Sequence, residues 1–114
     1  MIEKERTRRI VDELLIYYLK HNIEQFNVQV NYEERQVAVE IQGQCEKEPA
    51  DLDLFSQMLK VPRNPNIEGY YDELLGVHDS SRTKPDYQHL GMLIDQAEVN
   101  YENNNLQVKL IRKF

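Results

Sequence analysis

Apolar residues in the first half of the chain follow first a helical and then a strand-like spacing. Between residues 2 and 24 they recur three and four positions apart, as they do along one face of an α-helix. Over residues 26–32 and 37–42 they alternate with polar residues, which is typical of strands with one buried face. The charged residues 33–35 separate the two alternating segments. We therefore predict a long amphipathic helix followed by an antiparallel hairpin.

The middle of the chain predicts two further helical segments. A shorter helix over residues 49–60 begins at a proline, and its early aspartates, Asp51 and Asp53, are typical of capping and helix-dipole positions. Apolar residues return at helical spacing over 67–78. The polar residues 78–85 that follow predict an exposed loop.

The last part of the chain predicts one more helix and a second hairpin. Asp86 can start a helix whose apolar residues continue to Ala97, and residues 97–114 then have the pattern of two strands. The run Asn103 to Asn105 suits the turn of this hairpin, because asparagine tolerates positive φ. We detect no internal repeat and no linker.

This order of elements predicts an α+β fold. Helices and hairpins in this sequence are expected to form a two-layer α/β sandwich, with the helices on one face of a mostly antiparallel or mixed four-stranded sheet. A chain of 114 residues with 40% apolar content can bury one core and is too short for two. We therefore predict a single domain over residues 1–114.

Charge and cysteine content exclude several classes of function. With 20 acidic and 14 basic residues, the formal net charge of −6 disfavours nucleic acid and anionic membrane surfaces as partners. No apolar run approaches the ~20 residues that span a bilayer, and the first residues lack the apolar core of a signal peptide. The single cysteine, Cys45, excludes an internal disulfide and a paired-cysteine metal site. We expect a cytoplasmic protein that contacts neither nucleic acid nor membrane.

The segment IVDELLIYYLKH resembles the first conserved helix of the gyrase, heat-shock chaperone and histidine-kinase ATPase superfamily, and of its anti-sigma-factor serine kinase branch in particular. In that branch the helix has a Glu-Leu-x-x-Asn run followed by Ala-x-Lys-His. Here Glu13, Leu14, Lys20 and His21 match this pattern, and the family's metal-holding asparagine falls on Tyr17.

The end of the chain carries the second part of the resemblance. The segment LIDQAEVNYENNNLQVKLIRKF is similar to the last helix and hairpin of the same branch, with Leu93, Ile94 and Asp95 at the helix positions. The resemblance implies an ATPase-like domain whose usual N-terminal strand and helix are missing from the sequence given.

Both nucleotide-binding motifs of the superfamily are replaced. The aspartate that reads the adenine amino group would follow the second strand, where the sequence has Gln42 and Gln44 around a glycine. The glycine-rich phosphate motif would open the last helix, where the sequence has Pro85 and Asp86. Proline removes a backbone donor, and an aspartate occupies the positive end of the helix dipole. We therefore expect no binding and no hydrolysis of ATP.

The residues left at these positions define a candidate remnant pocket of Glu13, Tyr17, Gln42, Gln44 and Asp86. Glu13 and Tyr17 are four positions apart and share one helix face. A tyrosine in place of the asparagine can fill the pocket and bring a hydroxyl with it. The alternative is that Tyr17 and Tyr18 are ordinary packing residues between a helix and the sheet.

The adjacent tyrosines Tyr70 and Tyr71 form a candidate interaction surface, because tyrosine gives large contact area with few rotatable bonds. Isolated histidines and an aspartate-rich helix start give no catalytic or metal-binding pattern, so we expect no catalytic residue, metal or cofactor.

Two functions follow from these patterns. The first is a non-catalytic regulatory or protein-interaction module that binds a protein or itself, with a homodimer favoured over a monomer. The second is a small ligand binder or enzyme that uses a remodelled pocket near Glu13, Tyr17 and residues 78–84.

Overall fold

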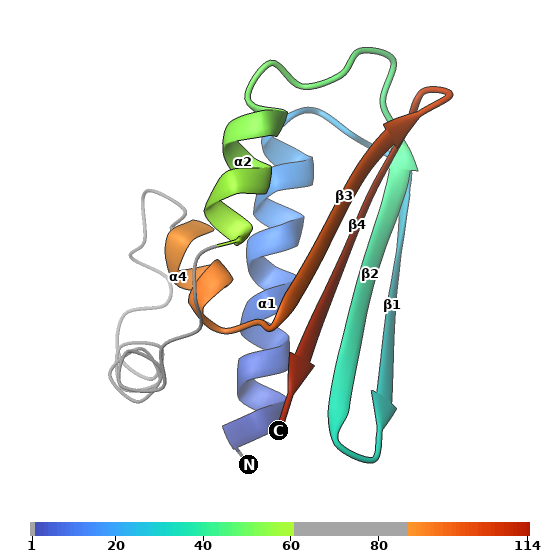
Figure 1. Ribbon diagram of the computed structural model, residues 1–114. Coiled ribbons are helices and arrows are strands. Elements are labelled where there is room, and N and C mark those ends of the chain that lie inside the picture. The colour runs from blue at the N-terminus through green and yellow to red at the C-terminus, as the bar shows by residue number, and fades with distance from the viewer. Residues whose placement is uncertain (1, 61–86) are drawn as a thin grey trace.

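The computed structural model describes residues 2–60 and 87–114, and these contain three helices and one four-stranded sheet. Both termini lie at the same end of the structure (Figure 1). The predicted helix over 67–78, the loop 78–85 and the tyrosines Tyr70 and Tyr71 fall outside the described residues. The prediction of an α+β fold is confirmed.

The first helix, α1 (Ile2–Lys20), ends four residues before the predicted end. Asn22 adopts a left-handed backbone with φ of 59°, and the Ile23 amide donates to the Tyr18 carbonyl at 3.1 Å. This is the six-residue closure by which a left-handed residue terminates a helix, and asparagine is among the few non-glycine residues that accept it. The helical spacing of apolar residues continues past this point, and it therefore overestimated the helix length.

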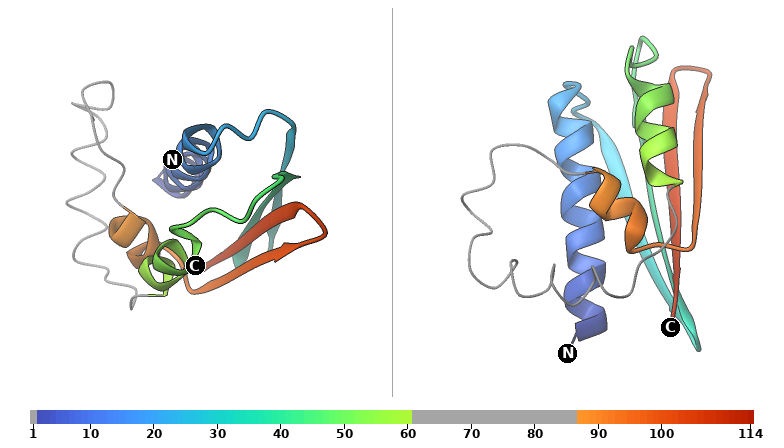
Figure 2. Two further views of the ribbon diagram at one scale, coloured as in Figure 1. Left: turned by 90° about the horizontal axis from the view of Figure 1, so that it is seen from above. Right: turned by 60° about the vertical axis from the view of Figure 1, so that its left-hand side comes forward.

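Two shorter helices accompany α1. Helix α2 (Leu52–Leu59) buries Leu52, Phe55 and Leu59, which is the apolar face that the sequence predicts. Helix α4 (Tyr87–Met92) ends earlier than the predicted helix, so that Ala97 lies in a strand instead. Seen from above, the helices lie on the same side of the sheet (Figure 2).

The sheet is open and wholly antiparallel, with strand order β1-β2-β4-β3. Hairpin 1 consists of β1 (Phe26–Glu33) and β2 (Gln36–Gln44), and hairpin 2 consists of β3 (Gln96–Glu102) and β4 (Asn105–Lys113). Both hairpins were predicted from period-two alternation. Polar residues on the face away from the helices remain accessible, as expected for an antiparallel sheet covered on one side.

The core lies between the helices and the two central strands. Every second residue of β2 and β4 is buried, beginning with Val37 and Leu106 respectively. The same alternation places Arg112 on the buried face, where its side chain is 1% exposed. The guanidinium Nη1 donates to the carbonyl of Leu93, the residue after α4, at 2.8 Å. A cation at a helix C-terminus is favourable because the terminal carbonyls carry partial negative charge.

Gly43 marks a close approach between β2 and the connection that leads into β1. A Cβ at this position would lie 2.8 Å from the Gln25 carbonyl oxygen and 2.8 Å from Phe26 Cβ. Any side chain here requires a backbone shift, so glycine is needed for space rather than for a special φ.

The two hairpins share a sequence and a register that the sequence analysis did not detect. Val30-Asn31-Tyr32-Glu33 in β1 is identical to Val99-Asn100-Tyr101-Glu102 in β3, and each run leads into a two-residue turn. In both hairpins the glutamate pairs with the first residue of the next strand, and the tyrosine pairs with the second. The conclusion that the chain has no internal repeat is therefore wrong for these hairpins.

The pairing of the central strands extends this relation to the whole sheet. Val39 of β2 and Val108 of β4 are equivalent positions, and their cross-strand partners, Leu110 and Ile41, are equivalent as well. The pairing of β2 with β4 is therefore symmetric about the opposite-charge pair Glu40 and Lys109: a half-turn at this pair exchanges the two strands. The sheet has an approximate two-fold axis that exchanges its two edge strands.

Candidate functional site

Tyr17 lies between α1 and α2, away from the sheet. Its side chain is fully buried, and its ring stacks on Phe55 with centroids 3.8 Å apart and planes 11° apart. The hydroxyl donates to Asp51 Oδ1 at 2.9 Å, just before α2 begins. The ring and the hydroxyl together fill the space between the two helices, as a buried tyrosine with a satisfied polar end can.

Asp51 gathers several side chains at this end of the helices. His21 Nε2 lies 3.0 Å from Asp51 Oδ1, without hydrogen-bond alignment, and it forms an ion pair when the imidazole is protonated. Lys20 Nζ lies 3.9 Å from Oδ2, in an exposed pair that contributes little to stability. The expected side-chain cap is wrong for Asp51, because its carboxylate makes no capping hydrogen bond to α2 and instead accepts from Tyr17.

Tyr18 performs a different task from its neighbour. Its hydroxyl reaches the Leu106 carbonyl at 2.7 Å and the Ile41 carbonyl at 3.2 Å, so it ties α1 to both central strands. Burial, with a smaller contribution from Cys45, raises the pKa of the Tyr18 phenol above its ordinary value of 10.0. Tyr18 is therefore the packing residue between helix and sheet, and Tyr17 packs between helices.

Glu13 is buried in an ion pair within α1. Its Oε1 lies 3.4 Å from Arg9 Nε, and both side chains are at most 5% exposed. Neither Glu13 nor Tyr17 lines the cleft at the end of β2 or the smaller one beside it. The arrangement suits a structural ion pair.

The other members of the candidate remnant pocket lie elsewhere. Gln42 and Gln44 are exposed on the face of β2 that points away from the helices, because they alternate with the buried Ile41 and Gly43. Asp86 lies outside the described residues. The structure thus brings Tyr17 and Glu13 to the helix layer and places the two glutamines on the opposite side of the sheet.

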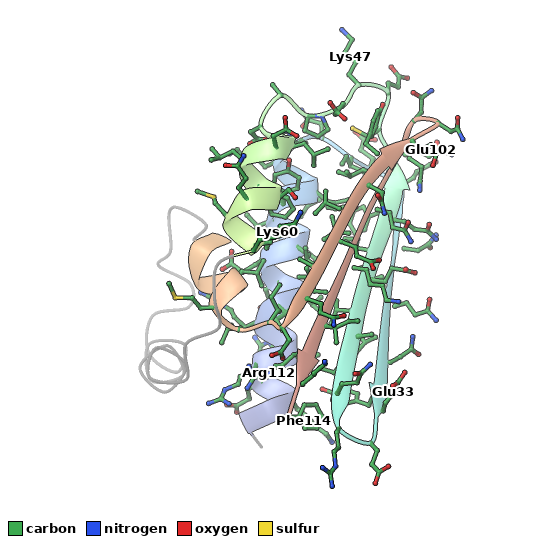
Figure 3. The ribbon with its side chains drawn as sticks, viewed as in Figure 1. Glu33, Lys47, Lys60, Glu102, Arg112 and Phe114 are labelled. Atoms are coloured by element: carbon green, nitrogen blue, oxygen red, sulfur yellow. The ribbon has the colours of Figure 1, made fainter. Side chains whose placement is uncertain are left out.

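An open cleft of about 910 Å³ occupies the end of the molecule where Lys47 and Glu102 project, opposite the end with Glu33 and Phe114 (Figure 3). The loop after α1, the segment after β2 and the turn of hairpin 2 form its walls. Half of its lining residues carry carboxamides, which donate and accept hydrogen bonds: Asn22, Gln25, Gln44, Asn103, Asn104 and Asn105. These carboxamides can hydrogen-bond a polar ligand, and Glu24, Glu46 and Lys47 add charged groups to the same lining.

Cys45 forms part of the cleft wall. Its amide donates to the Asn104 carbonyl at 2.8 Å, its carbonyl accepts from the Tyr101 hydroxyl at 2.7 Å, and its thiol donates to the Lys47 carbonyl at 2.9 Å. The two backbone groups thus join the end of β2 to hairpin 2, and the thiol bond stays within the segment after β2. The Cys45 side chain is partly buried.

Within 2–60 and 87–114, no three histidine, cysteine, aspartate or glutamate side chains gather closely enough to hold a metal ion. No helix in the same ranges is both long enough and apolar enough to cross a membrane.

Comparisons of the chain with protein-family models, curated proteins and solved structures return no match. The resemblance to the histidine-kinase and gyrase ATPase superfamily therefore stays a prediction. Sequence analysis also missed the acceptor of the Tyr17 hydroxyl, Asp51, since no spacing rule connects a residue of one helix to the residue preceding another.

Proposed function

We propose that this protein is a non-catalytic regulatory or protein-interaction module, built on a two-layer α/β sandwich similar to the ATPase domain of the anti-sigma-factor serine kinases. It neither binds nor hydrolyses ATP. The observation that carries the proposal is the complete burial of Tyr17, stacked on Phe55 at the position where the family keeps its metal-holding asparagine. A buried ring at that position leaves no room for a hydrated magnesium ion beside Glu13.

Two further features support the same proposal. The order of a helix, a hairpin, an intervening segment, a helix and a second hairpin is the order on which the resemblance rests. The sheet also leaves apolar side chains exposed along β1, which a protein partner can cover.

Nucleotide titration tests the absence of ATP binding. Isothermal calorimetry of the full chain with ATP or ADP and magnesium should give no saturable heat at millimolar nucleotide. Tyr17→Asn should behave in the same way, because the adenine-reading aspartate and the phosphate-binding glycines are still missing. A saturable isotherm for the natural chain would overturn the proposal. An isotherm gained by Tyr17→Asn would show that Tyr17 alone blocks a site that is otherwise intact.

Unfolding of a Tyr17 variant tests whether the ring fills the space between the helices. Tyr17→Ala should lower the free energy of unfolding by about 3–5 kcal/mol, as loss of a buried aromatic side chain does. Ile16, the preceding residue, is 38% exposed, and Ile16→Ala is the matched control with an expected change below about 1 kcal/mol. Similar losses for the two variants in urea unfolding would contradict the filled-pocket interpretation.

A second candidate function is binding of a small neutral polar molecule in the carboxamide-lined cleft. The cleft volume of about 910 Å³ favours it. Glu13 and Tyr17, near which the sequence placed the alternative pocket, do not line this cleft, although His21 lines it and contacts the Tyr17 ring at a centroid distance of 4.6 Å. Two-dimensional NMR with a set of sugars and amides would test it. Shifts confined to the amides of Gln44, Cys45 and Asn104 would support ligand binding there, and the absence of such shifts would remove this candidate.

A further inference from the structure

Strand β1 forms one edge of the sheet and exposes an apolar stripe. Val28, Val30 and Tyr32 are 38%, 39% and 48% exposed, although they point to the same face as the core residues of β2. Their cross-strand partners, Ile41, Val39 and Val37, are at most 1% exposed. The apolar face of the sheet is therefore fully covered over β2 and only partly covered over β1.

Helix α1 extends the stripe. The Tyr32 hydroxyl bonds to Thr7 Oγ1 at 2.8 Å near one end of β1, and the Tyr18 ring lies 5.8 Å from the Phe26 ring at the other. Helix α1 thus runs antiparallel along β1. Three apolar residues follow Thr7 at intervals of four and form a ridge on the helix surface: Val11, Leu15 and Leu19.

This ridge and the stripe together form the β1 edge patch: Val11, Leu15, Leu19, Val28, Val30 and Tyr32. Val11 and Leu15 are half-buried, and Leu19 is 60% exposed. The hydroxyl bond to Thr7 holds the Tyr32 ring against the helix, so the patch is ordered before any partner binds.

Strand β1 lacks the features that normally protect a sheet edge. It contains no proline and no lysine, and its eight residues pair with β2 in an unbroken register without a bulge. Its one charged residue, Glu33, is its last. The equivalent edge, β3, carries Glu98 next to its central residue and Glu102 at its end, and its apolar residues are half-buried against the core.

We propose that a second copy of this chain covers the β1 edge patch by antiparallel pairing of β1 with β1 across a two-fold axis at Val30. The sheets of the two copies then join into one, and their helix layers lie on the same side. This inference rests on the proposed function, since it names the partner of the interaction module.

The sequence of β1 is complementary to itself in this register. Val30 faces Val30 of the second copy, and each Val28 faces a Tyr32, so every residue of the apolar stripe meets another apolar residue. On the other face, Glu33 meets Asn27 and Gln29 meets Asn31. The two Glu33 side chains lie about 20 Å apart along the strand, which is beyond the screening length at physiological salt. The same two-fold pairing of β3, about Val99, would place each Glu98 opposite an Asn100 and diagonal to the other Glu98, so that two like charges become neighbours on one face.

Cross-linking at the axis gives the sharpest test. In a Cys45→Ser background, Val30→Cys should form a disulfide-linked dimer under mild oxidation, because directly opposed residues of antiparallel strands lie about 4.5–5.5 Å apart at their Cα atoms. Val99→Cys in the same background is the matched control at the equivalent position of the other edge, and it should remain monomeric. Cross-linking through Val99→Cys and not through Val30→Cys would overturn the proposal.

Sedimentation of the natural chain provides a test without new cysteines. Over about 1 to 200 µM protein, the mass should rise from 13.6 kDa toward twice that value. Val30→Lys places two ammonium groups on the axis and should raise the dimer dissociation constant at least about 100-fold, while its circular dichroism stays native because Val30 is exposed. A constant 13.6 kDa species across the range would overturn the dimer. Nucleotide binding by an intact dimer would instead overturn the proposed function, so the two failures are distinguishable.

Discussion

Hairpins 1 and 2 carry the same strand motif but differ in what covers them. Val30 and Tyr32 in β1 and Val99 and Tyr101 in β3 are equivalent by sequence, by register and by the approximate two-fold axis of the sheet. The β3 pair is half-buried against the core, where α2 contacts that strand, whereas the β1 pair is exposed. The same four-residue motif is therefore half-buried in one hairpin and exposed in the other. The difference comes from the helices that pack on each strand and not from the motif itself.

The tyrosine hydroxyls show the same contrast. Tyr101 donates to the Cys45 carbonyl and so joins hairpin 2 to the end of hairpin 1. The Tyr32 hydroxyl instead donates to the Thr7 hydroxyl of α1 and makes no bond to hairpin 2 among the described residues. Hairpin 2 therefore contributes its motif to the stability of the monomer, and hairpin 1 leaves the same motif available for contact with another chain.

Truncation of each tyrosine should separate these two roles. Tyr101→Ala should lower the free energy of unfolding by about 2–3 kcal/mol, less than a fully buried ring would because Tyr101 is half-buried. Tyr32→Ala should cost about 1 kcal/mol or less in dilute protein. Urea unfolding measured at two protein concentrations is the appropriate experiment.

The concentration dependence of these losses sharpens the contrast. A dimer stabilises the folded chain by mass action, so the loss caused by Tyr32→Ala should grow as protein concentration rises. The loss caused by Tyr101→Ala should stay constant. Equal losses at all concentrations would mean that the two hairpins are covered alike in solution.

The turns of the two hairpins differ in backbone conformation as well as in sequence. Asn103 and Asn104 have φ of 52° and 62°, the left-handed values of a type I′ turn, whereas neither Glu34 nor Arg35 is among the residues with positive φ. The double variant Asn103→Glu, Asn104→Arg should therefore destabilise the chain by about 1–2 kcal/mol.

The reverse exchange is its control. Glu34→Asn with Arg35→Asn should change the free energy of unfolding by no more than about 0.5 kcal/mol, because asparagine accepts both right-handed and left-handed backbone. Thermal or urea unfolding of the two double variants gives the comparison. Similar losses for both would indicate that the turn conformation does not select its residues.

Periodicity predicted the elements of this fold better than their limits and their exposure. Alternation over 26–32 and 37–42 identified both strands of hairpin 1, because a period of two depends only on which residues face the core. The end of α1 could not be read in this way, since it depends on the backbone of Asn22 and not on any apolar residue. Exposure of Val28 and Val30 depends on which element lies above them, which a strand's own sequence does not encode.

The repeat escaped sequence analysis for a related reason. Only four consecutive residues are identical between the hairpins, and the turns that follow differ in both sequence and conformation. The common register of the two ladders is what makes the four residues significant. Sequence analysis grouped Tyr17 and Glu13 of α1 with Gln42 and Gln44 in one candidate pocket, but the pleat of β2 turns the two glutamines to the face away from the helices.

Tyr18 links the two hairpins, and removal of its hydroxyl should have a smaller effect than the Tyr101 truncation or the exchange of the hairpin 2 turn. Tyr18→Phe deletes the hydroxyl that bridges the Ile41 and Leu106 carbonyls and should cost about 1 kcal/mol near neutral pH. Burial raises the pKa of the native phenol above 10.0, so the folded chain keeps the proton at a pH where the unfolded chain releases it. The stabilising contribution of Tyr18 is therefore complete below pH of about 10 and declines above it, at up to about 1.4 kcal/mol per pH unit.

The phenylalanine variant lacks this decline, and other groups that titrate in alkali cancel in the difference between the two proteins. Urea unfolding between neutral pH and pH of about 11 should show the advantage of the natural chain shrinking as pH rises. A constant difference across that range would mean that the Tyr18 phenol titrates alike in the folded and unfolded chains, and that its bridge between the hairpins opens to solvent.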